Sequence, residues 1–301
     1  MLFQSSRLAM RPLLVAACAG LTSPALSQEH GGTDNSGEIV VSAEREVQAK
    51  AAAAQARAIT QPAPPGKPLA RHYLPVCVKV FGLPAAYGQA LAERVMDNVR
   101  SMNLRVAPAG CSPNVWIGFT NDSRKQVEAL RKRDPAMFVS LKRHEIDRIF
   151  KGSSAVQVWH ATETKGVDGR AIPVVRMPDG SEYEVNQQWK ASRLGSTIRV
   201  DMTGSLVVFD RKLVGRRTLA QLADYATMRV LASTYDQAEF DPAMPTILSL
   251  FAAESGAPEE LTDFDRAYLG GLYRLGEGAD HTKMHDAVRS AYLSQTAEKK
   301  D

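Results

Sequence analysis

This chain could carry out metal or hydrolytic chemistry with its histidines and with one carboxylate, Asp224, which lies in a predicted buried helix. The chain has 301 residues, six of them histidine. His144 begins the run HEIDR, but position 148 is arginine where a second zinc-binding histidine would be needed. His281 and His285 are spaced i, i+4 in HTKMH, which can place both on one helix face. No glutamate lies between them and the segment is polar, so we predict surface histidines and no metal site.

The other chemically capable residues are scattered along the chain. His160 stands alone at the end of a strand-like run, and His30 and His72 fall in a segment predicted to be a tether. Ser205 is followed by an apolar run where a nucleophile elbow would continue as a helix. Phosphate-binding and dinucleotide-binding glycine motifs do not occur. The members of a Ser-His-Asp triad converge only in space, so the sequence neither shows nor excludes one. It predicts no catalytic residue and no cofactor.

Residues 219–233 (LAQLADYATMRVLAS) are predicted to form a buried helix around Asp224. Thr218 and Gln221 fit a capping box at its start. Apolar residues lie on nearly every side, which is typical of a helix enclosed by other elements. Asp224 is therefore expected to cap, to pair with Arg229, or to hydrogen-bond in the core. If a cleft exists, the candidate site residues are Asp224, His160, His281 and His285.

A mixed sheet followed by this helix and a mostly helical C-terminal half resembles the architecture of zincin-like metalloproteases. In that family two histidines one turn apart bind zinc, and the glutamate between them activates water. Setting Asp224 at the glutamate position puts Ala223 and Thr227 at the ligand positions. Alanine cannot bind zinc and threonine binds it poorly. The resemblance therefore implies a degenerate relative that lacks the HExxH motif.

The first 27 residues have the features of a signal peptide. Arg7 and Arg11 precede a short apolar run, and the small residues Ala25 and Ser27 stand at positions −3 and −1 of a cleavage site. The run is well below the roughly 18 residues of a membrane span. We expect a periplasmic or secreted protein with no transmembrane helix in the mature chain. The alternative is a lipoprotein anchored through Cys18.

Residues 28–72 are predicted to form a flexible Ala/Pro-rich tether, followed by a globular domain at 73–290 and a polar tail at 291–301. The Ala-rich run has no strong apolar face, and the Pro-rich exit is QPAPPGKPLA. Within the tether, residues 37–45 (GEIVVSAER, which includes Glu38) resemble the short box that outer-membrane receptors present to TonB. A chance β-prone run in a linker is the alternative.

The globular domain is predicted to be α+β, a single domain with a mixed β-sheet packed by helices and a mostly helical C-terminal part. Short apolar runs at 76–83, 104–107, 114–120, 154–163 and 196–210 favour strands. Helical patterns cover 87–102, 219–233, 260–275 and 285–293. The triplet Pro178-Asp179-Gly180 indicates a turn, so residues 172–187 are expected to form a hairpin that flanks a cleft or forms a surface insertion.

Cys77 and Cys111 are the two cysteines that remain once the first 27 residues are removed. An even number in an oxidising compartment favours a disulfide. The bridge would close a loop of about 35 residues. Two buried free thiols are the alternative.

The expected role follows from compartment and from what the chain lacks. Basic and aromatic residues do not alternate in a stacking pattern, so no nucleic-acid partner is expected. The segments CVKVFGLP, CSPN, QLADYATMRVLA and LTDFDRAYLGGLY resemble an uncharacterised family of exported bacterial proteins, which implies a fold and a compartment but no activity. We expect an exported cell-envelope protein that binds an envelope protein or a small ligand without catalysis. The alternative is a metal-assisted, zincin-like hydrolase with an unrecognised active site.

Overall fold

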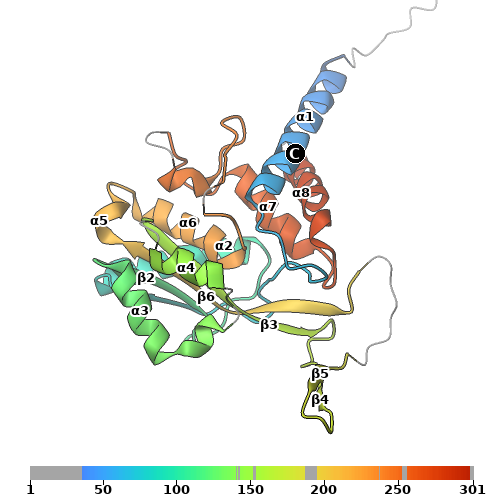
Figure 1. Cartoon of the computed structure of the whole chain (residues 1–301). Helices are drawn as coiled ribbons and strands as arrows, with labels where there is room; N and C mark the ends of the chain where they lie inside the picture. The colour runs from blue at the N-terminus through green and yellow to red at the C-terminus, as the bar shows by residue number, and fades with distance from the viewer. Residues whose placement is uncertain are drawn as a thin grey trace, which may run out of the picture.

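Four strands in the order β1-β2-β6-β3 form the main sheet (Figure 1). The computed structural model describes residues 36–139, 141, 143–151, 154–186, 195–236, 238–252 and 256–298. Strands β1 (Val78–Phe81), β2 (Val115–Thr120) and β6 (Ile198–Asp210) are parallel neighbours, and β3 (Val156–Gly166) runs antiparallel to β6. This mixed sheet confirms the predicted α+β class, and it places β3 at one edge.

Helices cover both faces of the sheet because successive strand residues point to opposite faces. In β6, Val207 and Phe209 join the cluster that contains α2 (Ala85–Ser101) and α6 (Leu219–Leu231). Leu206 and Val208 join a second cluster on the other face, beneath three helices: α3 (Ser123–Arg133), the short η1 (Pro135–Phe138) and α4 (Arg143–Lys151). The remaining short helices are α5 (Arg211–Val214) and η2 (Ile247–Phe251).

The C-terminal part is helical, as predicted, with α7 (Asp263–Arg274), η3 (His281–Lys283) and α8 (Met284–Glu298). The predicted caps are present. Thr218 and Gln221 form a capping box at α6, and Thr262 caps α7 with Asp265 at the third helical position. None of the described helices is long and apolar enough to cross a bilayer.

The predicted tether is wrong for residues 36–72, because helix α1 (Ser36–Ile59) packs beside α8 (Figure 1). Its contact face consists of small residues, Ala49, Ala52 and Ala56, and ends at Ile59, all fully buried. Alanines at this spacing form a stripe that lets helices approach closely, although they give little amphipathic signal. The backbone of the TonB-box-like stretch, 37–45, lies within this helix, so it is helical and not extended.

Other predicted boundaries also change. The folded part begins before Tyr73, since Leu69 and Arg71 are buried, and the predicted tail at 291–301 is helical as far as Glu298. The strand predicted at 104–107 is reduced to one isolated bridge between Val76 and Val106. The predicted signal peptide, with Cys18, lies outside the described residues.

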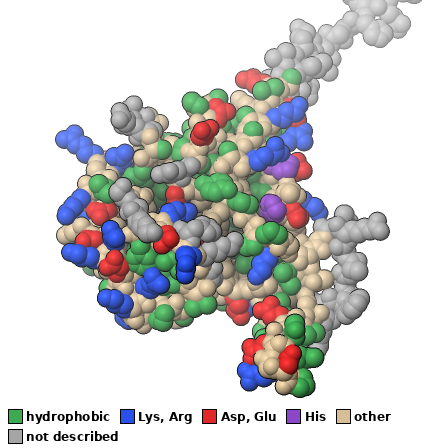
Figure 2. Space-filling view, in the orientation of Figure 1, with side chains coloured by type: hydrophobic (Ala, Val, Ile, Leu, Met, Phe, Trp, Pro, Cys, Tyr) green, Lys and Arg blue, Asp and Glu red, His purple; other side chains and the backbone are tan. Residues whose placement is uncertain are grey.

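The predicted hairpin is present as β4 (Val174–Arg176) and β5 (Glu182–Glu184). It projects from the body, and hydrophobic and charged side chains share its surface (Figure 2). Val175 pairs with Tyr183, and both side chains are exposed. The hairpin is therefore an insertion outside the core, and Glu184 of β5 also flanks a cleft, so the structure agrees with both predicted alternatives.

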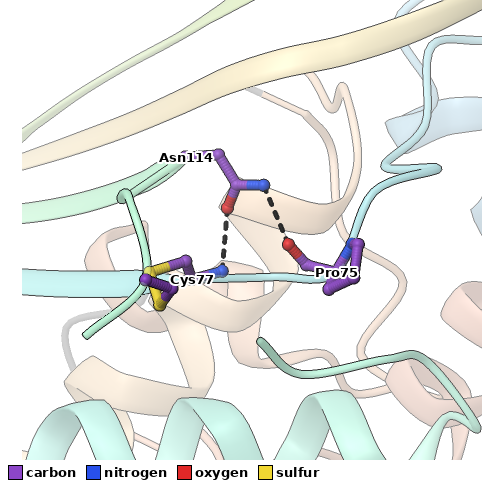
Figure 3. Close-up of a disulfide and its surroundings, with 4 residues drawn as sticks. Pro75, Cys77 and Asn114 are labelled. Atoms are coloured by element: carbon purple, nitrogen blue, oxygen red, sulfur yellow. Dashed lines mark hydrogen bonds between the residues drawn. A yellow bond between two sulfur atoms is a disulfide. The ribbon is translucent and has the colours of Figure 1, made fainter. Parts of the chain in front are cut away.

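The predicted disulfide joins Cys77 to Cys111, whose Cα atoms are 6.2 Å apart. Asn114 ties the same strand entries together (Figure 3). Its Oδ1 accepts a hydrogen bond from the Cys77 N–H at 2.8 Å, and its Nδ2 donates to the Pro75 carbonyl at 3.0 Å. The bridge and this amide together fix the start of β1 against the start of β2.

Candidate binding cleft

A cleft of about 890 Å³ opens along the outer edge of β3. Its other walls are the segment 61–70, four residues around the start of α4 (Val139, Leu141, Glu145 and Arg148), Glu184 of the hairpin strand β5, and residues of the segment 229–235 at and after the end of α6. Val158 and Trp159 are successive residues of β3, belong to the clusters on opposite faces of the sheet, and both line the cleft. The cleft therefore opens beside the strand, in the plane of the sheet. Its volume lies within the ~300–1,000 Å³ of small-ligand sites.

The segment 61–70 crosses the cleft as a Pro-rich strap. Gln61 Nε2 donates to Glu145 Oε1 of α4 at 3.3 Å, and Lys67 Nζ donates to Thr164 Oγ1 of β3 at 2.9 Å. Four prolines restrict its backbone: Pro62, Pro64, Pro65 and Pro68. The sequence predicted this stiffness but not that the segment packs on the domain.

Buried Arg71 anchors the C-terminal side of this strap. Its guanidinium donates to the carbonyls of Leu272 at 3.0 Å, Leu275 at 2.7 Å and Gly276 at 2.9 Å. These carbonyls lie at and just after the C-terminus of α7, where unsatisfied acceptors and the helix dipole favour a cation. The strap is therefore fixed to the body at the residue where it leaves the cleft.

His160 lies within β3 and lines the cleft, so the prediction that it is isolated is wrong. Its Nδ1 is 2.9 Å from the hydroxyl of Ser205. Nε2 of His72 lies 2.9 Å from the same hydroxyl and 3.0 Å from the Val230 carbonyl. His72 was predicted to lie in a tether, yet it is buried in the core. Two histidines distant in sequence therefore meet on one serine.

Both imidazoles of this cluster are neutral at ordinary pH. Because a carbonyl only accepts, the 3.0 Å contact with Val230 indicates that His72 carries its proton on Nε2. The Nδ1 of His72 is buried and has no partner among the described groups. Burial lowers the pKa of His72 to about 4, and burial with the charges of His72, Arg229 and Arg148 lowers the pKa of His160 to about 3.

This arrangement does not favour acid–base or nucleophilic catalysis. A general base works best when its pKa lies near the working pH, which is several units above that of His160. Ser205 is fully buried, and its hydroxyl lies 2.9 Å from Val230 O and from His160 Nδ1, with the weaker acceptor Met202 Sδ at 4.0 Å. The cluster holds β3, β6 and α6 together beside the cleft.

Two arginines at the α4 end of the cleft share one carboxylate. Arg148 of α4 pairs with Asp236 at 2.9 Å, and the buried Arg229 of α6 pairs with the same carboxylate. The pairing of Arg229 with Asp224 suggested by the sequence is therefore wrong. Glu145 lies one turn before Arg148 in the same lining, so two arginines and two carboxylates meet at this end of the cleft and their charges balance.

Three buried polar atoms in the cleft residues have no partner among the described groups. They are Nε1 of Trp159, whose ring stacks on Phe138 at 5.1 Å between centroids, Nε of Arg229 and Oγ1 of Thr234. Buried polar atoms are normally hydrogen-bonded, and each exception calls for an explanation, such as a bound water or ion. Their position in the wall agrees with a binding role for the cleft.

Asp224 does not line the cleft and has a structural role. It is fully buried and receives two hydrogen bonds from Arg94 of α2, from Nε at 2.8 Å and Nη2 at 2.7 Å. Asn98 Nδ2 donates to it at 2.7 Å and the Leu261 backbone N–H at 2.9 Å. The carboxylate therefore hydrogen-bonds in the core, as one of the predicted alternatives stated, and joins α6 to α2 and to the segment before α7.

His281 and His285 lie apart from the cleft, in a smaller hollow of about 300 Å³ beside α1. Each lies near an aspartate, His281 at 3.6 Å from Asp280 and His285 at 3.4 Å from Asp286. Over the part of the chain that the structure describes, no three His, Cys, Asp or Glu residues form a group that could hold a metal ion. Of the four candidates from the sequence, only His160 lies in the cleft.

Several residues of the cleft were not found from the sequence. Gln61 and Glu145 are separated by 84 positions, and Lys67 and Thr164 by 97, so no local pattern connects them. The one available signal was the Pro-rich composition of the strap. Scans of family models, of curated proteins and of solved structures found no match to this chain.

Proposed function

We propose that this chain is an exported binding protein of the cell envelope, and that its ligand occupies the cleft along β3. The observation that carries the proposal is the cleft itself, which has a fixed strap, a cluster of charged side chains at the α4 end and three buried polar atoms without described partners. Binding sites typically combine apolar walls with a few convergent polar groups.

Export is supported by the signal-like first 27 residues and by the disulfide, because disulfides persist in oxidising compartments. A periplasmic or secreted location is the form of the proposal that we favour, with a lipid anchor at Cys18 as the alternative. The hydrolase alternative has less support, since its four candidate residues lie in three separate places and His160 is a weak base.

The proposal is tested by filling the cleft. Thr164→Trp puts a large ring into the lining, whereas Glu163→Trp changes an exposed neighbour on the same strand that does not line the cleft. The mature chain and both variants are screened by thermal shift against small metabolites and synthetic peptides. We expect ligands that stabilise the unaltered chain and Glu163→Trp but not Thr164→Trp. Ligands that stabilise all three equally, or no ligand at all, would contradict the proposal.

A further inference from the structure

Three buried side chains in the wall of the cleft carry polar hydrogens that have no acceptor among the described groups. Trp159, Arg229 and Thr234 are each only 3% exposed, and all three line the cleft. The atoms concerned are Nε1 of Trp159, Nε of Arg229 and Oγ1 of Thr234. An unpaired buried donor costs free energy, so three of them around one cleft indicate a partner that accepts hydrogen bonds there.

Two of these donors are held in place by the other contacts of their side chains. The indole of Trp159 stacks on Phe138 with 5.1 Å between ring centroids. Nη1 of Arg229 donates to the Tyr235 carbonyl at 3.1 Å, and Nη2 pairs with the carboxylate of Asp236. Donors that are already fixed lose little conformational freedom when a ligand binds.

The chemistry of the unpaired atoms indicates what the ligand presents. An indole N–H and a guanidinium N–H can only donate, whereas the hydroxyl of Thr234 can donate or accept. A carbonyl oxygen supplies acceptor sites alone. Each hydroxyl of a saccharide would bring a further donor, and Thr234 has the only one of these three atoms that can accept. The set therefore favours carbonyl groups over a polyhydroxylated ligand.

The charges of the described lining favour a ligand without net charge. Two arginines meet two carboxylates at the α4 end, and Lys67 and Glu184 add one charge of each sign elsewhere in the lining. Apolar side chains, among them Leu69, Leu141 and Val158, form much of the remaining wall. Moving a charged group from water into such a site is unfavourable unless the charge is paired.

We propose that the cleft binds an uncharged carbonyl compound of the amide class, whose oxygen atoms accept hydrogen bonds from Trp159, Arg229 and Thr234. This assignment rests on the proposed function, because it names the ligand class of the same cleft. The hydrogen bond from Arg229 is charge-assisted and is the strongest of the three.

The first test compares four probes that share one aromatic skeleton. N,N-dimethylbenzamide carries only an acceptor, benzyl alcohol adds a donor, benzoate is an anion and benzylamine is a cation. Each is titrated into the ¹⁵N-labelled mature chain, and the indole N–H signals of the three tryptophans are followed by NMR. The signal that disappears in Trp159→Phe identifies Trp159. We expect the amide to move this signal downfield and to bind about tenfold more tightly than benzoate or benzylamine. Thr164→Trp should abolish the shift.

The second test makes the same substitution at an unpaired and at a paired threonine. Thr234→Val removes the unpaired hydroxyl and should weaken amide binding about three- to tenfold, the loss expected for one hydrogen bond. Its urea midpoint without ligand should stay the same or rise, because no hydrogen bond is lost. Thr227→Val is the matched control, since this buried hydroxyl donates to the Ala223 carbonyl at 2.9 Å and accepts from Asn98 at 3.1 Å outside the cleft. Its midpoint should fall and its affinity for the amide should be unchanged.

The outcomes separate this inference from the function on which it rests. The inference is overturned if the amide leaves the Trp159 signal in place, or if benzoate or benzylamine binds as tightly. It is also overturned if Thr234→Val lowers the midpoint as Thr227→Val does, because the hydroxyl would then be paired, for example with a bound water. If the thermal-shift screen yields ligands of another class that Thr164→Trp abolishes, the inference fails and the proposed function stands. If no compound binds in a manner sensitive to Thr164→Trp, both fail.

Discussion

The buried histidine pair should make the free energy of unfolding fall in mild acid, and His72 is the residue to change. Its pKa is about 4 in the folded chain and near 6.5 when unfolded. Between these values the unfolded chain binds more protons, so stability is present above pH 6.5 and is lost as the pH falls toward 4. From pH 7.5 to 5.0 the loss from His72 alone is about 2 kcal/mol.

His160 acts in the same direction, because its pKa is lowered to about 3. Asp265 acts in the opposite direction, since burial raises the pKa of its carboxyl and the folded chain then binds the proton more readily. A comparison of the unaltered chain with His72→Gln removes this background, because Asp265 contributes equally to both. Any cost of the substitution at pH 7.5 also cancels in the difference between the two pH values.

The assay is urea unfolding followed by circular dichroism at pH 7.5 and 5.0. We expect the unaltered chain to lose about 2 kcal/mol more than His72→Gln over this interval. Equal losses in the two proteins would refute the reasoning, since they would show that His72 is protonated in the folded chain or exposed to solvent.

Three further predictions concern stability, each measured by urea unfolding at neutral pH. The paired change of Cys77 and Cys111 to alanine should cost about 3–4 kcal/mol for a loop of 35 residues, and an unchanged midpoint would argue against the bridge. Asp224→Ala should cost about 3–5 kcal/mol because it leaves buried donors unpaired, whereas a catalytic role without a structural one predicts little loss. Ile59→Ala should lower the free energy of unfolding by about 2–5 kcal/mol, while Val47→Ala on the exposed side of the same helix should change it by less than about 0.5 kcal/mol. Equally small effects of the two changes would contradict the packing of α1 and support a flexible tether.

Local sequence signals account for much of the fold. The alternating apolar runs located β2, β3 and β6, and the cap residues Thr218 and Thr262 located the starts of α6 and α7. Turn residues located the hairpin, and two cysteines in strand-entry positions located the disulfide. Most of these signals lie within a few residues of the feature that they predict. The disulfide is the exception, and it could be predicted because the predicted mature chain has only two cysteines.

Features that depend on packing between distant segments were missed. Helix α1 buries alanines, whose small side chains give no amphipathic pattern, so its contact with α8 could not be recognised. The partner of Asp224 is Arg94, 130 positions away, although Arg229 lies nearer in sequence. The cleft likewise depends on the fold, because its strap meets β3 and α4 only after the sheet has formed.

Hydrogen–deuterium exchange of the mature chain with and without a ligand from the screen is the most direct test of the central claim, that β3 borders the binding site. We expect protection to concentrate in three segments: the strap at 61–70, α4, and β3 from Val156 to Thr164. Protection confined to the β4–β5 hairpin, or to the hollow around His281 and His285, would contradict the account.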